Sequence, residues 1–145
     1  MNIKKALAKK NKLVGEMTEE FNKANSYNSI VVGNTRHYNI KECLDKWFSL
    51  SAELVELKTK IHKANTPVFG KIFLLSELKN QIKLLKGFNC TEGIDNNPYR
   101  GRGDSSVVMD VEINTIFKDE LIKKLETRIE NLQEELDEFN YNTEI

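Results

Sequence analysis

Apolar side chains recur at alternating steps of three and four residues in four segments of the chain. The first stripe covers residues 3–24 and is interrupted only at Lys10, whereas the second covers residues 40–64 without a break. A shorter stripe covers residues 74–88, and the most regular one covers residues 122–139. Because this spacing places one apolar face along a helix, the pattern predicts three long helices and one short helix.

The inward faces of the two leading helices follow directly from these stripes. We expect them to be formed by Ile3, Leu7, Val14, Met17, Phe21 and Ala24 in the first helix, and by Ile40, Cys43, Trp47, Leu50, Leu54, Leu57, Ile61 and Ala64 in the second. Because Trp47 takes an inward position, its neighbour Phe48 must point elsewhere and could mark a second apolar face.

Polar residues at the segment ends predict where the helices begin and end. Asn39 is a good N-cap for the second helix, and Glu42 stands at the position that can reach back to it. Pro67 disfavours a helical conformation at the residue before it, so we expect the second helix to end at residues 65–67. Asn114 is the expected cap of the last helix.

The segments between the helices contain short runs that resemble strands. Residues 107–113 alternate between apolar and polar, which is the period of a strand with one buried face. Residues 29–32 precede a Gly-Asn pair and read as one arm of a hairpin, and residues 68–73 could supply a further strand. The fold class expected is therefore mainly α: an antiparallel helical bundle or coiled coil with a small β element formed by inter-helix segments.

Composition places the chain among ordinary globular domains. It has 145 residues, of which 39% are hydrophobic and 30% charged, too apolar for a disordered chain and the length of one domain, residues 1–145. Two cysteines are too few for a disulfide-stapled secreted module. No apolar run approaches a membrane span, and the first residues lack the apolar core of a signal peptide, so we expect a cytoplasmic location.

Charge is distributed unevenly although the chain has no net charge. Residues 1–13 carry five lysines and no acid, whereas residues 110–145 carry eleven acids and four bases. In an up-down-up-down bundle, the start of the first helix lies beside the end of the last, so these opposite charges would face each other around Glu134, Glu135, Asp137 and Glu138. The same charges could instead pair two copies of the chain.

No constellation for catalysis, metal binding or cofactor binding is present in the sequence. His37 and His62 have no carboxylate or cysteine at metal-ligand spacing, Cys43 occupies an inward helical position, and no motif surrounds Cys90. Phosphate-binding glycine loops, nucleophile elbows and zinc-protease helices are absent as sequence motifs. We therefore expect no catalytic, metal or cofactor site.

Two segments could still contact a partner. The N-terminal lysines and the loop that contains Tyr99, Arg100 and Arg102 could bind phosphates, although a dedicated nucleic-acid module shows a basic excess that this chain lacks. The polar tail with Asn140, Tyr141 and Thr143 is either a contact site or, as we favour, the closure of free carbonyls at the bundle end. A small-ligand or peptide site at the same end is a third possibility.

Three segments resemble a family of small bacterial helical proteins of uncharacterised function that carry the label septicolysin. They are residues 3–7 (IKKAL), residues 61–66 (IHKANT) and residues 139–145 (FNYNTEI), the last of which is the most specific. The chain departs from the family pattern at residues 67–71 (PVFGK). The resemblance implies a helical fold with a strand leading into a capped last helix, and it implies no active site.

The favoured interpretation is a non-enzymatic interaction or scaffold protein that self-associates through its helices or binds a protein partner. The candidate interaction residues are Phe48, Tyr99, Arg100, Arg102, Asn140, Tyr141 and Thr143. The alternative is a nucleic-acid-binding module that uses the basic first helix and the Arg100/Arg102 loop.

Overall fold

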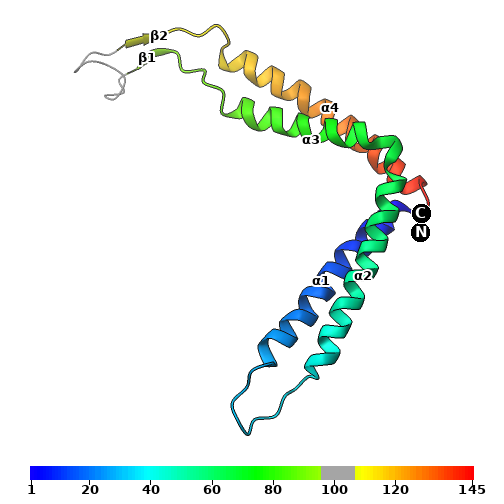
Figure 1. The fold of residues 1–145 in the computed structure, drawn as a ribbon. Coiled ribbons are helices and arrows are strands. Elements are labelled where there is room, and N and C mark those ends of the chain that lie inside the picture. Colours follow the sequence, from blue (N-terminus) through cyan, green and yellow to red (C-terminus); the bar gives the residue numbers. More distant parts are fainter. Residues whose placement is uncertain (96–106) are drawn as a thin grey trace. The chain divides into compact units, whose positions relative to one another are not determined.

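The computed structural model describes residues 1–95 and 107–145, and this part of the chain is mainly helical (Figure 1). Its elements, in order, are α1 (Ile3–Tyr27), α2 (Ile40–Ala64), a 3₁₀ helix η1 (Thr66–Val68), α3 (Phe69–Lys86), β1 (Gly93–Asp95), β2 (Val107–Met109) and α4 (Thr115–Asn142). The expected fold class is confirmed, with three long helices, one shorter helix and a small antiparallel sheet.

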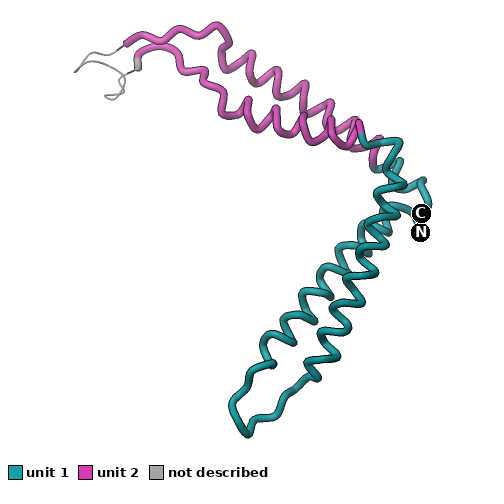
Figure 2. Tube along the Cα trace, viewed as in Figure 1, with its two compact units in different colours: residues 1–69, 137–145 teal, residues 70–136 magenta. Residues whose placement is uncertain are grey.

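The described elements group into two compact units, which are coloured separately in Figure 2. Unit 1 comprises Met1–Phe69 together with Asp137–Ile145, and unit 2 comprises Gly70–Leu136. Each unit is built on a pair of helices, α1 with α2 in unit 1 and α3 with the greater part of α4 in unit 2.

Unit 1 is an antiparallel hairpin whose core lies along the seam between α1 and α2. The core cluster contains two small or aliphatic residues of α1 and four of α2, namely Ala6, Leu13, Leu50, Leu54, Leu57 and Ile61. The inward positions predicted for α2 are confirmed at Cys43 and at the leucines and isoleucine of this list. An apolar stripe that repeats every seven residues thus packs as in a coiled coil.

The buried face of α1 differs by one residue from the predicted face. Val14 and Phe21, which were expected inward, are exposed, whereas their neighbours Leu13 and Glu20 are buried. The physical reason is that α1 packs against a single helix within its unit, and Glu20 finds cationic partners in the seam. The prediction for these two apolar positions was wrong, and the error leaves an apolar face open to solvent.

Unit 1 is closed by backbone pairing between the two ends of the chain. The Ile3 amide donates to the Thr143 carbonyl at 3.0 Å, the Ile145 amide donates to the Met1 carbonyl at 2.9 Å, and Asn2 forms a bridge with Glu144. The α-amino group of Met1 lies 2.6 Å from the Glu144 carboxylate. These bonds use backbone groups beyond the end of α4 that a helix leaves unsatisfied.

Unit 2 is tied at both ends of its helix pair. Near the start of α3, the Lys71 ammonium lies 2.8 Å from the Glu135 carboxylate of α4. At the other end, β1 and β2 pair antiparallel with Ile94 opposite Val108. The apolar stripe of α4 is confirmed, with Leu132 and Leu136 buried. Glu135 therefore pairs within unit 2. The sequence-based prediction that it would face the N-terminal lysines was wrong.

The predicted caps are confirmed, and two predicted strands are wrong. The side chains of Asn39 and Asn114 accept bonds from the Glu42 and Phe117 amides, so α2 and α4 begin where expected. Residues 29–32 form no strand because they lie in the loop between α1 and α2 and have no strand beside them. Residues 68–73 are helical because Pro67 ends α2 but starts η1, which leads straight into α3.

The predicted strand at residues 107–113 is confirmed in part, because only Val107–Met109 pairs. Its partner Gly93–Asp95 carries no alternating pattern and was not anticipated. Among the described residues, no helix combines the length and the hydropathy that a membrane crossing requires.

Candidate apolar interface on the helical hairpin

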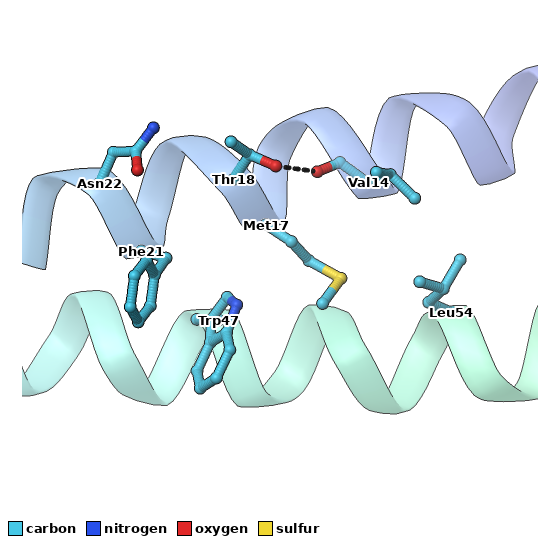
Figure 3. A pocket seen from close by; sticks show the side chains of 7 residues that line it. All are labelled: Val14, Met17, Thr18, Phe21, Asn22, Trp47 and Leu54. Atoms are coloured by element: carbon cyan, nitrogen blue, oxygen red, sulfur yellow. Dashed lines mark hydrogen bonds between the residues drawn. The ribbon is translucent and has the colours of Figure 1, made fainter. Parts of the chain in front are cut away.

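An open apolar groove runs along one flank of the hairpin in unit 1 (Figure 3). The volume of this groove is about 330 Å³, and its lining consists of Val14, Met17, Thr18, Phe21, Asn22, Trp47 and Leu54. The five apolar side chains form the floor, while Thr18 turns its hydroxyl back to the Val14 carbonyl at 3.0 Å. The polar atoms of the rim are thus partly satisfied within α1, and the groove offers mainly carbon surface.

Aromatic side chains form a continuous row in this groove. The Phe21 ring of α1 and the Trp47 ring of α2 have centroids 5.3 Å apart, and the Phe48 ring lies 4.9 Å beyond Trp47. Figure 3 shows Phe21 and Trp47 meeting from the two helices. Tilted rings at such distances attract each other, so the three rings form a continuous aromatic surface from the groove to the outer side of α2. The sequence-based expectation that Phe48 points away from the seam is confirmed, because 62% of the residue is exposed.

The groove flank is free of charged side chains over several turns of both helices. A second hollow, of about 190 Å³, shares Phe21 with the groove and continues it towards Ile40 and Leu44. On α2, helical spacing carries the same flank outward through Ser51 to Val55, which is 61% exposed. We call this surface the apolar face and define it by Val14, Phe21, Leu44, Trp47, Phe48, Ser51 and Val55.

The opposite flank of the hairpin carries the ion pairs between α1 and α2. The Lys9 ammonium pairs with the Glu53 carboxylate, and the Lys46 ammonium lies 3.0 Å from the Glu20 carboxylate. Glu20 is also 3.4 Å from Lys23, one turn along its own helix. The ion pairs between α1 and α2 therefore lie on one flank of the hairpin, and the lining of the groove on the other flank contains no charged side chain.

These charges determine the register of the hairpin. The apolar stripe of α2 repeats every seven residues, so it would tolerate a slip of one heptad. A slip in one direction would place Glu53 opposite Glu20 and Lys60 opposite Lys9, and a slip in the other would place Lys46 opposite Lys9. Because each slip creates a like-charge contact, the charged flank excludes both alternatives and keeps Phe21 beside Trp47.

Glu20 is a buried acid with a full set of donors. Only 6% of the residue is exposed, and its carboxylate accepts hydrogen bonds from Lys46 and from Lys23. The hydrogen bond from Lys46 lowers the pKa of Glu20 below its ordinary value, against the opposing effect of burial. Burial, and then the negative charge of Glu20, raise the pKa of Cys43, so this thiol is a packing residue rather than a nucleophile.

The polar tail lies at the closed end of unit 1 rather than on the apolar face. The Thr143 carbonyl accepts a hydrogen bond from the Ile3 amide. The Tyr141 carbonyl accepts one from the side-chain amide of Asn2 at 3.0 Å. Asn140 and the exposed Tyr141 line a shallow hollow together with Lys4. The three candidates Asn140, Tyr141 and Thr143 thus lie together at the end of unit 1 where the first and last residues of the chain pair. Tyr99, Arg100 and Arg102 fall outside the described residues.

Sequence reasoning missed most of the apolar face. Val14 and Phe21 were assigned to the core because they fit a stripe with Leu7 and Ala24 equally well. The signal that could have found this face is a second stripe through Leu13, Met17, Glu20 and Ala24, which requires a buried acid. Lys23, three residues after Glu20, and Lys46 on the facing helix pair with the Glu20 carboxylate and so offset the cost of burying its charge.

Among residues 1–95 and 107–145, no cluster of three or more histidine, cysteine or acidic side chains could hold a metal ion. Comparisons of the chain with protein-family models, with curated proteins and with solved structures found no match. The resemblance to the septicolysin-labelled family accordingly stays a prediction.

Proposed function

We propose that the protein is a non-enzymatic helical interaction protein that self-associates by packing the apolar faces of two copies against each other. The observation that carries the proposal is the heptad spacing of exposed apolar residues on both helices. Val14 and Phe21 are seven residues apart on α1, and Phe48 and Val55 are seven residues apart on α2. Such spacing on a two-helix hairpin is half of the pattern that a four-helix bundle buries.

A second copy of the chain fits this face better than a charged partner. Two identical uncharged surfaces can approach about a twofold axis without like-charge repulsion, and each then supplies what the other lacks. Four charged side chains of the hairpin are paired with each other on the other flank, as Lys9–Glu53 and Glu20–Lys46. Covering the exposed parts of Phe48 and Val55 contributes about 1–2 kcal/mol for each residue.

The test is light scattering after size exclusion, at low and high salt, on the wild-type chain and on the variant Phe48→Ser/Val55→Ser. We expect the wild-type chain to show twice the monomer mass of 16.7 kDa at both salt concentrations, because the interface is apolar. The variant dimer should dissociate about 10,000-fold more readily, since its two copies together lose about 6 kcal/mol of burial. Its fold should persist, because both residues are already exposed in the hairpin.

A matched control replaces exposed apolar residues of unit 2. The variant Val108→Ser/Ile116→Ser removes side chains of comparable exposure and should leave the mass unchanged. A wild-type chain of 16.7 kDa at every concentration would contradict self-association and leave the groove to another occupant. Equal loss of association in the control variant would place the interface elsewhere.

The nucleic-acid alternative gains no support from the geometry of the first helix. Lys9 and Lys12 pair with Glu53 and Glu16, so part of the basic segment is occupied within unit 1.

We also propose a cytoplasmic location for the protein. Its two cysteines, Cys43 and Cys90, are free thiols, as is usual for proteins of that compartment.

A further inference from the structure

Two adjacent valines are displayed at the tip of the loop that joins α1 to α2. Val31 is 71% exposed and Val32 is 99% exposed, which makes Val32 an apolar side chain with almost no protein contact. Exposed neighbouring aliphatic side chains on an ordered loop form the kind of apolar surface that marks interaction sites. We call Val31 and Val32 the valine tip.

The backbone of the loop holds the valine tip outward. The Asn34 amide donates to the Val31 carbonyl at 3.0 Å, and Gly33 has a φ of 90°, as the third residue of a type II turn requires. Val32 thus occupies the corner of a tight turn, where its side chain cannot fold back onto α1 or α2. The turn presents the two valines in a fixed conformation.

The base of the loop is fastened to the end of α1. The Arg36 guanidinium donates to the carbonyls of Tyr27 and Asn28, at 3.2 Å and 2.9 Å. The Tyr27 ring also meets the rings of His37 and Tyr38 edge-on, each with centroids 5.4 Å apart. Because these contacts order the loop before any partner binds, little conformational entropy would be lost on binding.

The charged residues nearest to the tip along the chain are basic. Between residues 21 and 41 the chain contains Lys23, Arg36 and Lys41 and no acidic residue, and the nearest acids along the chain lie on the helices. Lys23 pairs with Glu19 and Glu20, whereas Arg36 and Lys41 belong to no ion pair within the described part of the chain.

We propose that the valine tip is a docking surface for an anionic lipid bilayer, into which Val31 and Val32 insert while Arg36 and Lys41 contact the headgroups. An anionic bilayer offers hydrocarbon to the two valines and negative charge to Arg36 and Lys41, two cations that have no ion pair in the described part of the chain. Tyr38, which is partly exposed in the same loop, is a residue type that favours the interfacial layer. The proposal is independent of the apolar face.

Co-sedimentation with vesicles tests the proposal. The full chain is mixed with vesicles of pure phosphatidylcholine or of equal parts phosphatidylcholine and phosphatidylglycerol, and the bound fraction is measured. We expect binding to the anionic vesicles, at least tenfold weaker binding to the neutral ones, and a further loss at high salt. Val31→Ser/Val32→Ser should reduce binding at least tenfold, and Lys41→Gln about fivefold.

Val108→Ser is the matched control, because Val108 is 80% exposed in unit 2 and should not affect vesicle binding. Far-UV circular dichroism should be identical for all variants, since none of the replaced side chains is buried. A wild-type chain that ignores both vesicles overturns the proposal and leaves the tip for a pocket on a protein. Equal binding to both vesicles, or undiminished binding of the double valine variant, overturns it as well.

Discussion

The two helical hairpins have similar apolar stripes and differ in how many hydrophobic side chains they bury. Ten of the fourteen buried hydrophobic residues in the described part of the chain belong to unit 1, and four belong to unit 2. The seam of α1 and α2 includes the small residues Ala6 and Ala24, which allow close approach, whereas the buried residues of α3 and α4 are all leucine or isoleucine. Small seam residues therefore accompany the better-buried pair.

The hairpins also differ in the arrangement of charge. In unit 1 the pairs Lys9–Glu53 and Glu20–Lys46 connect the helices along a single flank, and the groove on the other flank has no charged residue in its lining. In unit 2 the described pairing between the helices is Lys71–Glu135, near one end only. The comparison teaches that an apolar stripe alone pairs two helices, while the distribution of charge determines register and decides which face stays open for a partner.

The largest expected effect comes from shortening one core leucine in each unit. Leu13→Ala and Leu78→Ala each remove a buried side chain and should lower the free energy of unfolding by about 2–4 kcal/mol. Because unit 2 has fewer buried residues, Leu78→Ala should abolish the amide-exchange protection of α3 and α4, whereas Leu13→Ala should only weaken that of α1 and α2. Hydrogen exchange read by mass spectrometry distinguishes the two patterns; equal loss in both units would contradict the comparison.

A smaller effect is expected from the charges that determine register. Lys9→Glu and Glu53→Lys each create a like-charge contact and should cost about 1 kcal/mol, because the pair is half-exposed. The double variant Lys9→Glu/Glu53→Lys restores attraction and should regain most of that loss. Chemical denaturation measures the cycle, and emission from Trp47, the single tryptophan, reports whether the groove is intact. Additive losses in the double variant would exclude a register role for this pair.

The smallest effect concerns acid. The pKa of Glu20 is lowered in the folded chain, so its contribution to stability is present above the ordinary carboxyl pKa of 4.5 and is lost as the pH falls below it. Stability should therefore be insensitive to this group from pH 7 to about pH 5 and should decline in stronger acid. Glu20→Gln should flatten that decline relative to the wild-type chain in denaturation curves collected across this range; an unchanged acid limb would exclude Glu20 as its source.

The sequence predicted the elements better than it predicted the open face. The bounds of α2 follow from Asn39 and Pro67, whose preferences act locally and need no knowledge of the partner helix. The inward face of α1 depends on which helix it meets and on whether Glu20 finds donors, and both are properties of the assembled hairpin. Strand β1 could not be predicted, because three residues without alternation carry no signal until Val107–Met109 lies beside them.

The candidate residues show the same division. Phe48 was identified because its neighbour Trp47 had already been assigned to the seam. Adjacent residues of a helix point in different directions, so Phe48 had to point away from the seam. Val14, Phe21 and Val55 emerged only when the packing of two helices left one flank uncovered. The side chains of the polar tail were expected to bond free carbonyls, whereas the contacts that the structure shows are strand-like backbone pairings with the first residues of the chain.

The central claim is that a second copy covers the apolar face, and Trp47 emission measured against protein concentration tests it most directly. Trp47 lines the groove and is half-buried in the single chain, so its emission should shift to shorter wavelength as copies associate, in step with the rise in mass. Phe48→Ser/Val55→Ser should keep the long-wavelength emission at every concentration tested. Emission that stays constant while the mass doubles would contradict the account, because association would then occur away from the groove.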